Sequence, residues 1–186
     1  WPLSVSPAKL GTHIVIHSLT KYINASSDTL GGVTCASREF IDSLKNVNNG
    51  ANMLLGPTMD SLRSASVMKN LRTLHIRMKQ HSYNAMYLAE HFEEDGLKVV
   101  YPGLKSHSGH NLYASMINPE YGFGGMMTLD FGTLDKANEL MELMQSRKLG
   151  YLAVSLGFYK TLFSAPGTST SSEIPIEEQE AMGLTD

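Results

Sequence analysis

The chain has 186 residues, a length that suits one sizeable domain or parts of two, and its 42% hydrophobic and 18% charged residues are typical of a globular protein. A formal net charge of −3 disfavours a nucleic-acid or anionic-membrane surface, since both partners need clustered Lys and Arg. No signal peptide or apolar run of about 18 residues is found, and the single cysteine excludes an internal disulfide. We therefore expect a cytoplasmic protein that binds neither nucleic acid nor membrane.

Two short strands and one capped helix are predicted near the start of the chain. The β-branched run Ile14–Ile16 is typical of a buried strand, and the run Gly31–Ala36 indicates a second one. Ser37 is a candidate N-cap for a helix over Arg38–Leu44. Residues 46–57 carry turn signals and are expected to be loop.

A long helical segment is predicted between Thr58 and Gly96, because neither Gly nor Pro interrupts it. Its length favours two helices with a bend near Arg72–Thr73. Thr58 or Asp60 can cap the first helix, and Gly96 can end the second. The apolar side chains recur at helical spacing: Leu71, Leu74, Met78, Ala85, Ala89 and Phe92.

Strands and helices alternate in the remainder of the chain. The pattern predicts strands over 97–101, 125–131 and 151–156, helices over 134–147 and 176–182, and a Ser/Thr-rich loop over 164–172. This order of elements is typical of an α/β fold.

The segment His17–Tyr22 carries the most informative chemistry. The preceding strand places it at a strand end, where open α/β sheets bind their ligands. Ser18 and Thr20 offer hydroxyls that suit a phosphate oxygen, and the amine of Lys21 can form a Schiff base with an aldehyde. A phosphate anchor beside a reactive lysine is what pyridoxal phosphate requires. By spacing alone, an ordinary solvated loop is the competing interpretation.

This segment resembles the cofactor-lysine motif of the pyridoxal-phosphate-dependent enzymes of Cys/Met metabolism, the family of the trans-sulfuration enzymes. Further resemblances follow in the family order through nearly the whole chain: Asp28 with Gly31–Gly32, Gly56–Pro57, Arg63, Leu71–Met78, His81, Asn84, Ala85, Val99–Leu104, Ser106–His107, Gly122–Met126 and Ala153–Gly157. The resemblance implies that the chain corresponds to the C-terminal half of such an enzyme.

The resemblance also implies a fold and a set of roles. Residues 1–95 would form the end of the cofactor-binding large domain of the fold-type-I transferase fold, with connecting helices, and residues 96–186 a truncated small α/β domain. Lys21 would hold pyridoxal phosphate and move protons, Ser18 and Thr20 would bind its phosphate, and Ser155 would lie at the substrate carboxylate. The family generally forms homotetramers, as dimers of dimers whose neighbours complete the active sites.

Several activities are compatible with these features. The resemblance favours cleavage of a C–S bond in a sulfur amino acid by β- or γ-elimination, as in cystathionine or methionine γ-lyase. The alternative is γ-replacement, as in cystathionine γ-synthase or an O-acylhomoserine sulfhydrylase, because the fold and the lysine are shared. Two other classes stay open, a fold-type-I aminotransferase and a non-catalytic module that retains the fold. Residues 24–27 and 162–170 depart from the family pattern near the active-site mouth and leave the substrate open.

Other parts of the family's site are expected outside these residues. The Asp that pairs with the pyridine nitrogen, the ring-stacking aromatic residue and the glycine-containing phosphate loop would precede Trp1. The carboxylate-binding Arg would follow the segment around Gly183. We therefore expect the 186-residue chain alone to hold the cofactor poorly and to lack turnover.

The remaining chemically suggestive residues are interpreted as structural. His107 and His110 lack a suitably spaced Cys or carboxylate partner, so we expect no metal site. The glycines of Gly122–Gly125 precede a strand rather than follow one, which disfavours a dinucleotide site. Three cationic side chains are predicted to form a solvated or subunit-contacting helix face: Arg72, Arg77 and Lys79.

Overall fold

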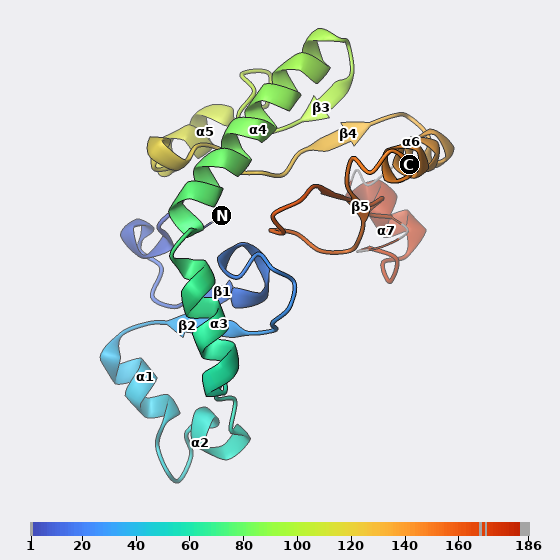
Figure 1. Ribbon diagram of the computed structural model, residues 1–186. Helices are drawn as coiled ribbons and strands as arrows, with labels where there is room; N and C mark the ends of the chain where they lie inside the picture. The colour runs from blue at the N-terminus through green and yellow to red at the C-terminus, as the bar shows by residue number, and fades with distance from the viewer. Residues whose placement is uncertain (1, 168, 170, 183–186) are drawn as a thin grey trace.

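The computed structural model describes residues 2–167, 169 and 171–182, so Thr168 and Thr170 of the predicted Ser/Thr-rich loop lie outside the described residues (Figure 1). In chain order the elements are η1 (Pro7–Leu10), β1 (Val15–Ser18), η2 (Leu19–Ile23), β2 (Gly32–Cys35), α1 (Arg38–Leu44), α2 (Ala51–Leu55), α3 (Ser61–Leu71), α4 (Leu74–Glu94), β3 (Lys98–Val100), α5 (His110–Met116), η3 (Pro119–Tyr121), β4 (Thr128–Asp130), α6 (Leu134–Ser146), β5 (Tyr151–Leu152), β6 (Leu162–Phe163) and α7 (Ile176–Ala181). None of the helices described is both long and apolar enough to span a membrane.

Helices α3 and α4 follow one another in a column, with α1 and α2 near the lower end of α3, whereas β5, α6 and α7 lie to one side of the column (Figure 1). Asp60 caps α3, because its carboxylate accepts hydrogen bonds from the N–H groups of Leu62 and Arg63 at 3.1 and 3.0 Å. The two helices are separated at Arg72–Thr73. Gly96 adopts φ = +82° just beyond α4. The predicted cap, break and stop are therefore confirmed.

The described strands form three small two-stranded sheets. The first joins β1 and β2 in antiparallel register, with His17 opposite Val33, and the second joins β3 and β4 in the same sense. The third joins β5 and β6 in parallel. Side chains of β1 alternate between half-buried and exposed, so that Ile16 is 73% exposed. The predicted strand is present, but one of its faces is open in this chain.

Two apolar clusters pack against α4. The first contains Tyr22, Ile23, Val67, Leu74 and Met78, and the second contains Ala85, Ala89, Tyr101 and Leu104. Four members of the predicted stripe are buried, namely Leu74, Met78, Ala85 and Ala89, whereas Leu71 at the break is 40% exposed. One helix therefore links the η2 segment to the unit built around β3 and β4.

Several elements differ from the prediction. Helix α2 lies within the region predicted to be loop, and the short helix α5, which begins at His110, has no counterpart among the predicted elements. The strand predicted over 151–156 is only two residues long, and it pairs with the unpredicted β6. These elements are short. Helix α2 is little more than one turn, and β5 and β6 are two-residue strands that pair with each other, so none of them has an extended periodic pattern.

We predict that Met78→Ala lowers the free energy of unfolding by about 2–5 kcal/mol, because a fully buried side chain would leave a cavity in the first cluster. Ile76→Ala is the matched control, since it removes apolar atoms from the same helix at a position that is 60% exposed. Chemical denaturation of the full-length protein measures both. Equal losses in the two variants would contradict this packing.

Candidate active site around Lys21

The backbone at Lys21 is irregular. The residue lies in the π-helix η2 directly after β1, and its φ of −86° and ψ of −130° are non-helical. The N–H of Leu19 donates to Gly31 O at 2.8 Å, and the N–H of Ala25 donates to Lys21 O at 2.8 Å. The lysine thus emerges at a strand end, as predicted, but from a kinked π-turn, a feature that is frequent at functional sites.

The amine of Lys21 meets the hydroxyl of Ser155. Nζ donates to Ser155 Oγ at 3.0 Å, although the two residues are 134 positions apart in sequence. The structure therefore brings two of the four predicted site residues together. No ion pair among the described residues involves Lys21, so a neutral hydroxyl rather than a carboxylate faces the amine.

Gly157 explains how the Ser155 loop reaches the lysine. Its φ is +80°, and a Cβ at this position would lie 2.3 Å from Tyr22 N and 2.8 Å from the carbonyl carbon of Lys21. Only a glycine allows the two backbones to approach so closely. Gly157 was part of the resembling segment, but its packing role was not predicted.

The two predicted phosphate ligands lie on either side of the strand end. Ser18 is exposed at the last position of β1, so its hydroxyl is accessible to a ligand. The hydroxyl of Thr20 accepts a hydrogen bond from the Gly31 N–H at 3.0 Å and lies 3.4 Å from Gly31 O. Both residues lie within three positions of Lys21 in the sequence. Their phosphate-binding roles stay predictions.

Arg77 corrects the prediction of a solvated helix face. Its Nη1 donates to Tyr22 O at 2.5 Å, and its Nη2 donates to Ile23 O at 3.0 Å. The side chain is half-buried, and burial lowers the pKa of its guanidinium. Arg72 and Lys79 are exposed as predicted. The spacing of charges on α4 could not distinguish Arg77 from its neighbours, because its partners are backbone carbonyls.

A partly buried hydrogen-bond network centred on Asn24 follows the lysine. Asn24 is 1% exposed, and its side chain donates to Asp28 Oδ1 at 2.7 Å and accepts from Asn70 Nδ2 at 2.8 Å. Asn70 Nδ2 also donates to Ser26 Oγ at 3.0 Å. The segment that departs from the family pattern is therefore tied to α3 by its side chains, which the sequence did not indicate.

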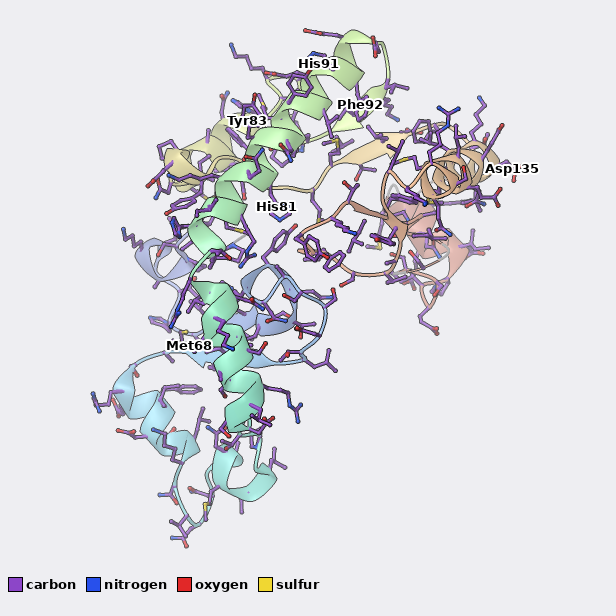
Figure 2. The ribbon with its side chains drawn as sticks, in the orientation of Figure 1. Met68, His81, Tyr83, His91, Phe92 and Asp135 are labelled. Carbon is purple, nitrogen blue, oxygen red and sulfur yellow. The ribbon has the colours of Figure 1, made fainter. Side chains whose placement is uncertain are left out.

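The buried ring of Tyr22 and the half-buried ring of His81 form a pair next to the lysine segment. Their ring centroids are 5.8 Å apart in an edge-on arrangement, with His81 projecting from α4 (Figure 2). Burial raises the pKa of Tyr22 to about 12. Burial and, to a smaller extent, the charge of Arg77 lower the pKa of His81. The environment therefore favours a protonated phenol and a neutral imidazole.

A family model described as "Cys/Met metabolism PLP-dependent enzyme" matches residues 1–186. The chain belongs to this family. Methionine gamma-lyase from Arabidopsis thaliana is 40% identical over 99% of the chain and 42% of its own length. Cystathionine beta-lyase from Coxiella burnetii is 34% identical over 100% of the chain and 46% of its own length. A crystal structure of cystathionine gamma synthase from Xanthomonas oryzae pv. oryzae superposes with a TM-score of 0.88 at 31% identity, covering 100% of this chain and 46% of that one.

These relatives confirm the predicted family, the fold-type-I α/β fold and the family's cofactor, pyridoxal phosphate. The chain spans less than half the length of these relatives. Its position in the C-terminal half and the division at residue 95 rest on the order of the motifs and stay predictions.

The residues around Lys21 fit the cofactor's chemistry. The lysine offers a primary amine, which can form a Schiff base with the cofactor's aldehyde, and this amine faces a hydroxyl rather than a carboxylate. The accessible hydroxyl of Ser18 is a suitable donor to a phosphate oxygen. The donor set on this chain therefore matches both ends of pyridoxal phosphate.

We predict that Gly157→Ala lowers the unfolding temperature more than Gly96→Ala. Both positions have φ near +80°, at +80° and +82°, so each alanine suffers a similar backbone strain of roughly 1–2 kcal/mol. Only the alanine at 157 would also collide with the backbone of Tyr22, whereas a Cβ at 96 meets nothing within 4 Å. Thermal unfolding of the full-length variants checks this, and equal shifts would argue against the close approach.

A second prediction concerns acid stability. Because the folded state lowers the pKa of His81, the unfolded chain binds its proton more readily. The stabilisation by the neutral ring is present above the ordinary pKa of 6.5 and is lost as the pH falls from there through the lower folded-state value. His81→Gln should flatten the decline of the unfolding temperature below about pH 6.5. His75→Gln, at an exposed position of α4, should leave the wild-type slope, and identical slopes in all three proteins would refute the assignment.

Proposed function

We propose that the full-length protein is a pyridoxal-phosphate-dependent lyase of trans-sulfuration that cleaves a C–S bond in a sulfur amino acid by β- or γ-elimination. The observation that carries the proposal is the meeting of the Lys21 amine and the Ser155 hydroxyl at 3.0 Å in a chain of this family. The curated relatives support the lyase activity, since they are named methionine gamma-lyase and cystathionine beta-lyase.

The four site residues would have different roles in this reaction. Lys21 would hold the cofactor through Nζ, and its free amine would take the proton from the substrate α-carbon. The cofactor, when bound, stabilises the negative charge that this leaves at the carbon. Ser155 directs the substrate carboxylate to the region of the amine, because its Oγ already lies within hydrogen-bond distance of Nζ. Ser18 and Thr20 hold the phosphate through their hydroxyls.

The second candidate is γ-replacement, and it is favoured by the structural likeness to cystathionine gamma synthase, at TM-scores of 0.88 and 0.87 in two crystal structures. The two activities differ in their products. The full-length protein would be incubated with cystathionine or methionine, and separately with an O-acylhomoserine and a thiol. Release of an α-keto acid supports the lyase, whereas a replacement product formed without α-keto acid would decide for the alternative.

A homo-oligomer, a dimer of dimers located in the cytoplasm, completes the proposal. The apolar side chains of Ile16 and Leu55 are 73% and 79% exposed in this chain. Exposed apolar side chains of this size are commonly buried in contacts within or between full-length subunits. The single cysteine, Cys35, suits a reducing compartment. Light scattering of the purified full-length protein would test the assembly, and a monomer would contradict it.

We predict that Lys21→Ala abolishes the near-visible absorbance of the cofactor-loaded full-length protein and its turnover, because no covalent bond to the cofactor can form. Lys45→Ala is the control, since Lys45 is exposed and pairs only with Asp42 among the described residues, at 3.6 Å. This variant should retain both signals. A band that survives in Lys21→Ala, with the cofactor still linked covalently to the protein by borohydride reduction, would show that another residue holds the cofactor.

A further inference from the structure

Arg77 reaches from α4 to the backbone of η2. Besides the carbonyls of Tyr22 and Ile23, its Nη2 donates to Asn70 O at 3.0 Å, and its Nε donates to Thr73 Oγ1 at 3.0 Å. All of its guanidinium nitrogens are thus engaged. Two contacts fix the group to the helical region, and the other two hold consecutive carbonyls of the lysine segment.

These two carbonyls need an external donor because η2 is irregular. The carbonyls of Leu19 and Lys21 accept from the N–H groups of Asn24 and Ala25 at 2.9 and 2.8 Å. Tyr22 and Ile23 are buried, and an unpaired carbonyl there would be costly. Arg77 supplies the donors, and a guanidinium can hold two adjacent carbonyls in a fixed geometry that a lysine ammonium cannot reproduce.

The peptide of Lys21 is consequently held from two directions. Arg77 binds the carbonyls that follow the lysine, while Gly157 packs against Lys21 C and Tyr22 N. The Gly157 loop also carries Ser155, the partner of the amine. The direction of the lysine side chain therefore depends on the backbone that Arg77 fixes.

We propose that Arg77 is a positioning residue for Lys21: by holding the carbonyls of Tyr22 and Ile23, it maintains the non-helical backbone at Lys21 that directs the amine to Ser155. This inference rests on the proposed role of Lys21. Without the guanidinium, η2 relaxes toward a regular turn, and the amine leaves the position from which it bonds to the cofactor and moves the substrate proton.

The test uses the full-length, cofactor-loaded protein. Arg77→Met keeps most of the aliphatic stem, and Arg77→Lys keeps the charge without the fork. The matched control is Arg72→Met, because Arg72 is exposed five residues earlier. Three properties are measured for each protein: the pH titration of the near-visible band, the fraction of Lys21 that borohydride reduction links to the cofactor, and kcat and KM separately.

Both Arg77 variants should shift the midpoint of the band's titration, reduce the trapped fraction and lower kcat on the order of 10- to 100-fold, with a smaller change in KM, because a misplaced reacting group slows the chemical step. Arg72→Met should resemble wild type. Titration and kcat that are unchanged in both Arg77 variants would overturn the proposal. So would recovery of wild-type values by Arg77→Lys, since the charge rather than the bridging geometry would then suffice.

A milder variant keeps the inference testable if both substitutions at Arg77 prevent folding. Thr73→Val removes the acceptor of Nε and leaves Arg77 in place, so it should shift the same titration in the same direction by a smaller amount. A folded Thr73→Val protein with wild-type titration and trapping would count against the proposal. Lys21→Ala separates the proposed function from the positioning role of Arg77. If the band is lost in Lys21→Ala while the Arg77 variants behave like wild type, the positioning role is refuted and the proposed function stands.

Discussion

The site depends on the contact between the lysine segment and two distant parts of the chain. The backbone at Lys21 is non-helical, so local hydrogen bonds cannot satisfy every carbonyl around it. Arg77 supplies donors from α4, and Gly157 allows a second backbone to approach within van der Waals distance. The apolar cluster around Tyr22 and Met78 holds these parts together. Thus, an irregular turn that would be unfavourable alone is stabilised by contacts from two distant parts of the chain.

Much of the architecture could be predicted from local patterns, because capping, helix breaks and apolar periodicity act over short distances. Asp60 and Gly96 behave as their residue types dictate, and the break at Arg72–Thr73 agrees with the length of the segment. The short elements could not be predicted in the same way. Strands β5 and β6 are held by pairing with each other, and the π-turn at η2 depends on groups from α4, so neither leaves a periodic signal in its own sequence.

The site was predicted unevenly for a related reason. Lys21 and Ser155 belong to segments that resemble a known family, and the structure brings them to 3.0 Å. Arg77 lies in such a segment as well, but a cation among others on a helix is ordinarily solvated, and its carbonyl partners have no side-chain signature. The buried Asn24 pairs with the half-buried Asn70, 46 positions further along the chain. Such contacts depend on tertiary geometry, which a single sequence does not display.

The separation of 134 positions between Lys21 and Ser155 limits what their hydrogen bond can do for the fold. Closing a loop of that length costs about 4 kcal/mol of chain entropy by the logarithmic law, several times the roughly 1 kcal/mol that one hydrogen bond contributes. The amine and the hydroxyl therefore cannot draw the two segments together by themselves. Their approach must follow the packing of Leu156 and Gly157 against the first cluster and the lysine backbone. The reactive geometry thus depends on this packing, and a chain that lacks it presents an amine without its partner.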